Sequence, residues 1–230
     1  MRNIMAVFYK QVKDTLKNKT VLIQFLLFPC MTVIMTKAVK MEKMPENFFT
    51  ELFAVMYIGM APLVSAAAIV SEEKETGTLR AFCMSGVKPS EYLFGIGVYL
   101  WIACMLGSSM MVLSGHYSGD QIPRFLLIMA AGIIISLMIG ACVGMASRSQ
   151  MAANSLSVPV MMVFSFLPML AMFNQTIEVL ARYTYTQQIH ALLSGIGYGI
   201  VKAEILWVLG GNGIVVLLLF VFFYKKHGLE

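Results

Sequence analysis

Long apolar stretches without Asp, Glu, Lys or Arg alternate with short charged connections along the chain. Six stretches are long enough to cross a hydrocarbon core of roughly 30 Å as a helix, which takes about 20 residues. A charge at mid-bilayer costs about 2.5–3.5 kcal/mol, so its absence is informative. The pattern predicts one domain, residues 1–230, of the all-α integral membrane class, with six transmembrane helices at 20–36, 52–71, 92–113, 125–147, 153–173 and 205–224.

A seventh uncharged segment, residues 183–201, differs from the other six. It contains Thr, Gln, His and Ser residues and ends in the glycine-rich string GIGYG. Backbone exposed to lipid must satisfy its hydrogen bonds internally, and a polar, glycine-rich helix does this poorly. We therefore expect residues 174–203 to form a re-entrant or outer helical hairpin.

Residues 1–19 show the periodicity of an amphipathic helix. At 100° per residue one face gathers apolar side chains and the opposite face gathers lysines, which suits an interfacial helix with its lysines near lipid phosphates. The two sets are Ile4, Met5, Phe8, Tyr9, Val12 and Leu16, and Lys10, Lys13 and Lys17. A solvated helix without a membrane role is the alternative. Because the apolar run starts only at Thr20, we do not expect a cleavable signal.

Composition supports the membrane class: 59% of the residues are hydrophobic and 13% are charged, against about 25% charged residues in soluble domains. With the N-terminus inside, the inner connections hold more Lys and Arg than the outer ones, which predicts that both termini are cytoplasmic. The net charge of +5 then indicates contact with anionic membrane lipid and not with nucleic acid.

The densest charge lies in residues 72–90, the connection after the second span. Gly77 can end a helix that continues from that span, and Thr78 can cap a new short helix over 79–85. Gly86 and Pro89 would end this helix, since proline cannot continue it. Ser90 with Glu91 is expected to cap the third span.

A helix of two turns is not stable alone in water and needs a surface to pack against. Leu79 and Phe82 share one of its faces, at i and i+3. This face can contact a cytosolic partner or the chain's own helix bundle, and the pattern alone leaves both alternatives open.

Several kinds of chemistry have no support in the sequence. A phosphate-binding loop needs a Gly-Lys pair, and none of the 18 glycines is followed by lysine. The three histidines and four cysteines are scattered, without metal-ligand or disulfide spacing. An intramembrane protease motif, E-E-x-x-x-R, would require arginine where Gly77 stands. An ion-coupled carrier usually needs a charge within a span. These two classes remain the alternatives to the interpretation below.

The string Glu73-Lys74-Glu75-Thr76-Gly77-Thr78-Leu79 resembles the E-R-E-x-G-T-L signature of bacterial ATP-binding-cassette (ABC) type-2 permeases. The resemblance extends to the layout of amphipathic helix, six spans and charged second connection. It also covers SRSQMAANSLSVP before the fifth span, Pro168, and YTYTQQIHALLSG before the last span. The chain departs from the family pattern at Lys74, Gly86, Ile96 and Thr186, which replace Arg, Pro, Lys and Pro respectively.

The resemblance implies a transport subunit without its own ATPase site or cofactor, paired with a second permease copy and with a cytosolic ABC ATPase that binds ATP and Mg. The short helix would be a coupling helix that docks in the ATPase. By this resemblance Gly77 would be the hinge, Leu79 and Phe82 the docking residues, and Glu73, Glu75 and Thr78 polar contacts or caps. The location would be a bacterial plasma membrane.

Two further patterns concern the spans themselves. Ser136, Gly140 and Gly144 recur every four residues, which allows close helix approach, either inside the bundle or at a subunit contact. The chain has 20 methionines, and Met suits surfaces that accept varied shapes. We therefore expect export of a hydrophobic or amphipathic substrate, such as a peptide toxin, a bacteriocin or a lipophilic drug.

Overall fold

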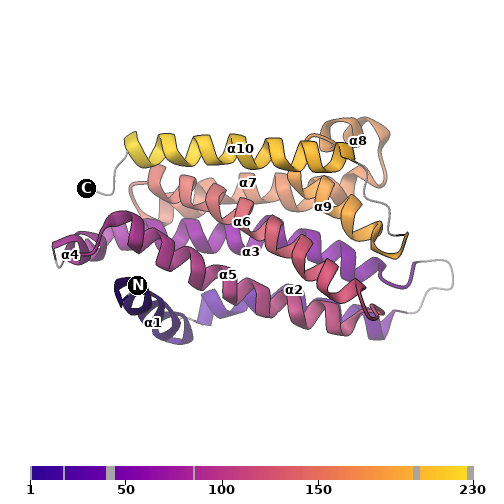
Figure 1. The fold of residues 1–230 in the computed structure, drawn as a ribbon, viewed down its shortest axis with the longest axis horizontal. Coiled ribbons are helices and arrows are strands. Elements are labelled where there is room, and N and C mark those ends of the chain that lie inside the picture. Colours follow the sequence, from indigo (N-terminus) through magenta and orange to yellow (C-terminus); the bar gives the residue numbers. More distant parts are fainter. Residues whose placement is uncertain (1, 18, 40–44, 85, 199–202, 227–230) are drawn as a thin grey trace.

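The computed structural model describes residues 2–17, 19–39, 45–84, 86–198 and 203–226, and within these ranges all regular structure is helical. Figure 1 shows the long helices running side by side, with α1 and α4 at one end of the bundle and α8 and α9 at the other. The helices are α1 (Arg2–Lys17), α2 (Lys19–Ala38), α3 (Phe48–Glu75), α4 (Thr78–Met84), α5 (Pro89–Ser114), α6 (Gln121–Ala146), α7 (Gln150–Ala171), α8 (Gln175–Ala181), α9 (Tyr185–Ser194), a 3₁₀ turn η1 (Ile196–Tyr198) and α10 (Ala203–Lys226).

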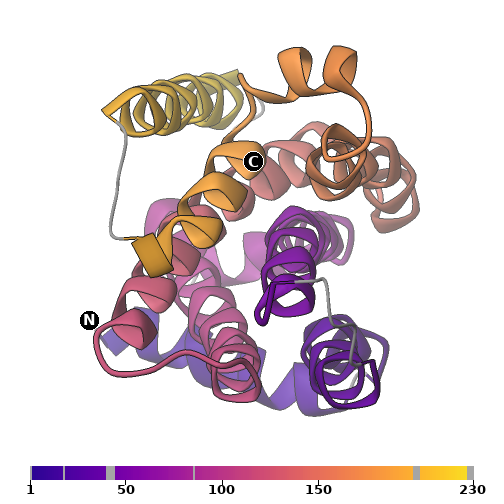
Figure 2. The same ribbon diagram turned by 90° about the vertical axis from the view of Figure 1, so that its right-hand side faces the viewer.

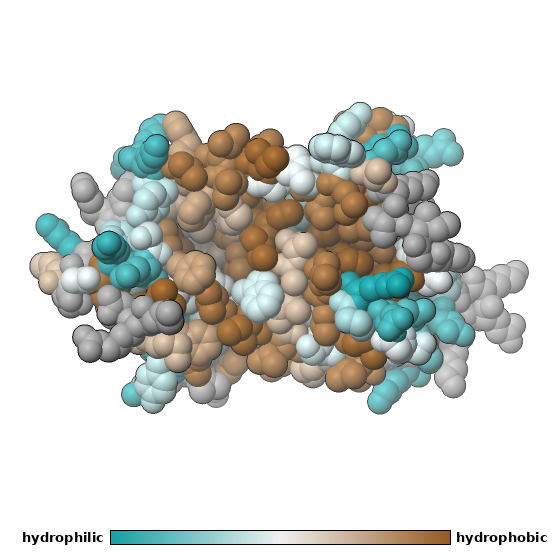
Figure 3. Space-filling model, viewed as in Figure 1, coloured by the Kyte–Doolittle hydropathy of each residue, from teal (hydrophilic) through white to brown (hydrophobic). Residues whose placement is uncertain are grey.

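Five described helices, α3, α5, α6, α7 and α10, are long and apolar enough to cross a membrane. Helix α2, at the position of the first predicted span, contributes a shorter apolar stretch, Leu22–Ala38. Figure 3 shows the expected surface, with apolar side chains in a broad middle belt and polar ones gathered towards the two ends. The prediction of an all-α, multi-pass membrane protein is confirmed.

The helices extend beyond the predicted spans at several ends. Helix α3 continues to Glu75, so the charged connection begins inside a helix. Helix α5 begins at Pro89, and its N-cap is Lys88, whose N–H donates to the Glu91 carboxylate at 3.3 Å. The predicted cap at Ser90 is therefore wrong, because proline takes the first helical position, where its missing N–H costs nothing.

Helix α7 likewise starts three residues before the predicted span, where the Ser149 hydroxyl accepts a hydrogen bond from the N–H of Ala152 at 3.2 Å. The predicted end of the short helix at Ser85, the end of the outer segment at 199–202, and the side chains of Leu16 and Lys17 lie outside the described residues.

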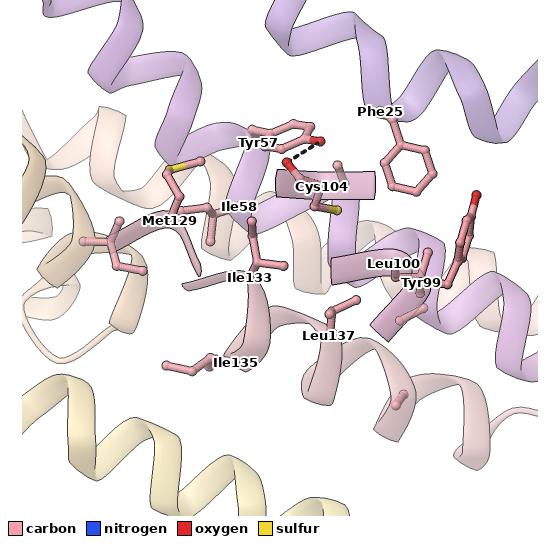
Figure 4. Packing of buried hydrophobic residues seen from close by; sticks show 14 of the residues in the cluster. Phe25, Tyr57, Ile58, Tyr99, Leu100, Cys104, Met129, Ile133, Ile135 and Leu137 are labelled. Atoms are coloured by element: carbon pink, nitrogen blue, oxygen red, sulfur yellow. Dashed lines mark hydrogen bonds between the residues drawn. The ribbon is translucent and has the colours of Figure 1, made fainter. Parts of the chain in front are cut away.

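Helix α3 occupies the centre of the bundle, and α2, α5, α6, α7 and α9 pack around it. In the end-on view of Figure 2 its purple ribbon lies in the middle of the other helices. Figure 4 shows Tyr57 and Ile58 of α3 among Ile133 of α6 and Cys104 of α5, and the Tyr57 hydroxyl donates to the Cys104 carbonyl at 3.4 Å. Helix α3 therefore contacts most of the other long helices of the described structure.

The stripe of small residues on α6 faces α3 within this chain. A Cβ at Gly144 would lie 2.8 Å from Cβ of Val70, and one at Gly140 would overlap the carbonyl of Leu63. Ser136 is fully buried, and its hydroxyl hydrogen-bonds the Tyr185 hydroxyl of α9 at 2.7 Å. In the described structure the stripe therefore packs inside the chain, against α3.

The short helices α8 and α9 cover the end of the bundle opposite α4 (Figure 1). Helix α9 has 10 residues, about 15 Å of helix, which is too short to cross the bilayer. Tyr185 and Ile189 are fully buried, and Ser194 donates to the Glu51 carboxylate of α3 at 2.8 Å. The described part of the predicted outer segment is thus a pair of short helices packed on the bundle.

Candidate functional site

The last turn of α3 carries the charges of the signature string, and they point in different directions. Successive residues of a helix are rotated by 100°, so residues i and i+3 lie near one another while the two residues between them face other sides. Glu72, Glu73, Lys74 and Glu75 thereby reach α1, α6 and α7. The α3-end cluster, as we call these residues and their partners, joins four helices at one level.

Glu73 connects α3 to the N-terminal helix. The residue is 7% exposed, and one carboxylate oxygen forms an ion pair with Nζ of Lys10 and accepts a hydrogen bond from Nε2 of Gln11 at 2.9 Å. Burial of a carboxylate is tolerated when it is paired in this way. Lys10 also lies 3.7 Å from Asp14. Lys10 therefore faces the bundle, and its predicted place on the lipid-phosphate face is wrong because a buried carboxylate attracts it.

Lys74 caps helix α6. Its Nζ donates to the carbonyl of Met145 at 2.9 Å and lies 3.4 Å from the carbonyl of Ser147. The last carbonyls of a helix have no intrahelical partner and carry the negative end of the helix dipole. The lysine that replaces arginine in the signature thus satisfies backbone groups of a helix far along the sequence.

Glu75 and Glu72 hold the beginning of α7. An oxygen of Glu75 accepts the backbone N–H of Gln150 at 2.7 Å, and Glu72 accepts Nε2 of the same residue at 3.1 Å. The first N–H groups of a helix are unpaired and favour negative charge. The short connection between α6 and α7 is consequently held from α3 at both of its ends.

A tight turn joins this cluster to α4. Gly77 has φ +68°, a conformation that side chains with a Cβ rarely adopt. A Cβ added there would meet nothing within 4 Å, so the backbone angle, and not lack of space, favours glycine. The hydroxyls of Thr76 and Thr78 lie 2.8 Å apart across the turn.

Helix α4 packs one face against the chain itself. Leu79 is 3% exposed, and the ring of Phe82 lies 5.2 Å from that of Tyr92 on α5, with Nζ of Lys10 5.8 Å from its centre. Of the two alternatives left open by the sequence, the described structure has this face on the chain's own bundle. The opposite face exposes Arg80, Ala81 and Met84, the last at 79%.

The structure thus brings Glu73, Glu75, Gly77, Thr78, Leu79 and Phe82 together at one end of the bundle and places Ser136, Gly140 and Gly144 along its core. Sequence reasoning missed Lys10, Gln11 and Gln150 as partners. The scarcity of charge was the available signal, since a buried carboxylate in an apolar chain needs a cation. Among the described residues no group of three or more His, Cys, Asp or Glu side chains forms a metal site.

Comparison with known proteins supports the resemblance seen in the signature. A search of curated proteins gave no match. The family model described as ABC-2 family transporter protein matches residues 1–225, nearly the whole chain. The chain therefore belongs to the ABC-2 transporter family and is a multi-pass membrane permease of that type.

Proposed function

We propose that this permease is the membrane subunit of an ATP-driven bacterial exporter and that α4 is its coupling helix. A separate cytosolic ABC ATPase would bind ATP and Mg and dock on α4, while this chain would hydrolyse no nucleotide. One observation carries the proposal: α4 is a short helix with an exposed outer face, joined to the end of the central helix α3 by a two-residue turn, Thr76 and the left-handed Gly77.

The geometry assigns different tasks to the two faces of α4. Its outer face, with Arg80 and Met84, is free to contact the ATPase. Its inner face, with Leu79 and Phe82, touches the bundle and passes a displacement of α4 to Tyr92 and so to α5. We therefore propose that Leu79 and Phe82, which were expected to dock on the ATPase, instead pass a displacement of α4 to the helix bundle. Gly77 acts as the hinge, since it alone connects the two helices with a positive φ.

Glu73 and Glu75 serve a different purpose in this proposal. They fix the end of α3 to α1 and α7, so that a force applied at α4 would move the α3-end cluster as a unit. Thr78 supports the turn through its hydroxyl contact with Thr76. In this proposal the charges of the signature anchor the end of α3 to which α4 is joined. The ATPase would contact the mostly uncharged outer face of α4 around Arg80.

We propose that the exporter contains two permease copies, identical or related, with both termini of each in the cytoplasm of a bacterial cell membrane. The ends of α1 and α10 lie at the same end of the bundle as α4, which is the arrangement this topology requires (Figure 1). The predicted spans are uncharged and rich in methionine, which favours a hydrophobic or amphipathic substrate such as a peptide or a lipophilic drug.

A photo-crosslinking amino acid at Met84, introduced in cells of the native host, tests the coupling role. We expect it to capture a protein that contains a phosphate-binding loop and ABC signature motifs, identified by mass spectrometry. The matched control is the same amino acid at Val179, which is 58% exposed on α8 at the opposite end. Equal capture of the ATPase from both positions, or no capture from Met84, would contradict the proposal.

A charge placed on the same face tests the function directly. Met84→Asp should abolish most ATP-driven transport while changing the free energy of unfolding by less than about 0.5 kcal/mol, because exposed positions tolerate substitution. The measurements are transport in reconstituted vesicles with the captured ATPase and thermal unfolding in detergent. Retained transport at wild-type rate in a stable Met84→Asp variant would refute α4 as the coupling contact.

A further inference from the structure

A groove of about 640 Å³ opens between α5, α6 and α10, with α3 at its base. Nearly all of its lining side chains are apolar. The polar atoms belong to Ser90 and Tyr224 at one end and to Trp101 at the other, whose indole N–H is already donated to the carbonyl of Ala130 at 3.4 Å. The groove therefore offers an apolar trough with free polar groups only at the α4 end.

The groove covers the depth of one membrane leaflet. Ser90 lies in the first turn of α5 and Trp101 eleven residues later, a rise of about 16 Å, close to half of a hydrocarbon core of roughly 30 Å. Tyr224 lies in the last turn of α10, next to the same end of the bundle. Figure 1 shows α5 and α10 on either side of α6, with these two ends toward α4.

Basic residues flank the polar end of the groove on both walls. Lys88 precedes Ser90, and Lys225 follows Tyr224; both side chains are exposed. Lys226 faces away from the groove, since its Nζ lies 5.6 Å from the centre of the Phe222 ring, which is not part of the lining. Glu91 is the acidic side chain on the same turn of α5, and one of its oxygens accepts the backbone N–H of Lys88. The charges at this end leave a net positive rim, which favours a phosphate group at the level where a lipid headgroup lies.

We propose that the groove binds one acyl chain of an anionic phospholipid of the cytoplasmic leaflet, with the phosphate held by Lys88 and Lys225. Helix α10 packs on α6 and α9, and a bound chain would fill the space between α10 and α5. The site is separate from the ATPase contact on α4. From the proposed function, the lipid proposal takes only the cytoplasmic location of this end of the bundle.

The two tryptophans of the chain make the proposal measurable. Trp101 lines the groove, and Trp207 is 80% exposed on α10 at the other end of that helix. In a Trp207→Phe background, the fluorescence of Trp101 reports the groove. The purified full-length chain is titrated in mixed micelles with phosphatidylglycerol or phosphatidylcholine that carries brominated acyl chains, which quench tryptophan on contact.

We expect brominated phosphatidylglycerol to bind about fivefold more tightly than brominated phosphatidylcholine, the effect of roughly one effective lysine at an anionic headgroup. Replacing Lys88 and Lys225 by glutamine should make the affinities for the two lipids equal. Gly97→Leu should prevent quenching, since Gly97 lines the groove and a Cβ there meets nothing within 4 Å, so the added side chain fills space without a clash.

The matched control is Gly210→Leu on α10, outside the groove, where an added Cβ is also unobstructed; it should leave quenching unchanged. Circular dichroism and size-exclusion chromatography verify that each variant is folded. Equal quenching by both lipids in the unmodified groove would show unselective contact with bulk lipid and overturn the proposal. Absence of quenching by either lipid, with the chain dimeric, would show that a second copy covers the groove and would overturn it as well.

Discussion

The last turn of α3 and the helix α4 are separated by only Thr76 and Gly77, yet they are held in opposite ways. The end of α3 is anchored through side chains to α1, α6 and α7. Helix α4 touches the bundle along one face and leaves the other exposed. The comparison teaches that charge in this membrane protein fixes helix ends in place, whereas the surface proposed for the partner is mostly uncharged.

A substitution that separates α3 from α6 should cause the largest loss of stability, because it disturbs the helix that carries the anchored charges. Gly144→Leu forces a side chain against Val70 and the carbonyl of Ala67, which a Cβ alone would already approach to 2.8 and 2.9 Å. We expect the free energy of unfolding to fall by about 3 kcal/mol, the upper range for overpacking a core. Thermal unfolding in detergent measures the loss. The control is Gly210→Leu, where an added Cβ meets nothing within 4 Å, and its free energy of unfolding should be unchanged. An equal loss of stability in both variants would contradict close packing of α3 on α6.

Removing the buried carboxylate should have the next largest effect. Glu73→Ala leaves Lys10 and Gln11 without their partner, and we expect a loss of about 2 kcal/mol, since breaking a largely buried pair leaves a charge uncompensated. A double-mutant cycle with Lys10→Met isolates the pair. Lys10→Met should reduce the free energy of unfolding only slightly in a chain that already carries Glu73→Ala. Full additivity of the two losses would mean that the ion pair does not anchor α1 to α3.

The smallest effect on stability should come from the turn between the two regions. Gly77→Val forces a residue with a Cβ into the left-handed conformation, at a cost of about 1–2 kcal/mol. Gly77→Asn is the control, because asparagine tolerates this conformation far better. Unfolding measurements should rank glycine above asparagine and asparagine above valine. If valine were as stable as glycine, the positive φ would not be needed to orient α4.

Local features of the fold could be predicted from the sequence because local rules govern them. Gly77 ends α3 and starts a short helix because glycine adopts the left-handed conformation that a tight turn requires. Runs of uncharged residues located the long helices, while their exact ends were missed at Pro89 and Gln150. Those ends depend on capping by Lys88 and Ser149, and several neighbouring residues offered comparable caps.

The tertiary partners of the signature charges could not be predicted in the same way. Periodicity placed Lys10 with the outward-facing lysines of α1, because it describes one helix and contains no information on Glu73, which lies 63 residues away. The burial of Leu79 was open for the same reason: a short apolar face fits the chain's own bundle or a partner equally well. Only the packing of α1 and α5 beneath α4 decides between them.

The hydrogen bonds of the α3 end also order the assembly of the chain during synthesis. The partner of Glu73 on α1 precedes it, so this link can form as soon as α3 enters the membrane. The partners of Lys74 and Glu75 follow 71 and 75 residues later. A nascent chain that has not reached Gln150 therefore carries an unfinished set of contacts at this end of the bundle, and insertion of α6 and α7 completes it.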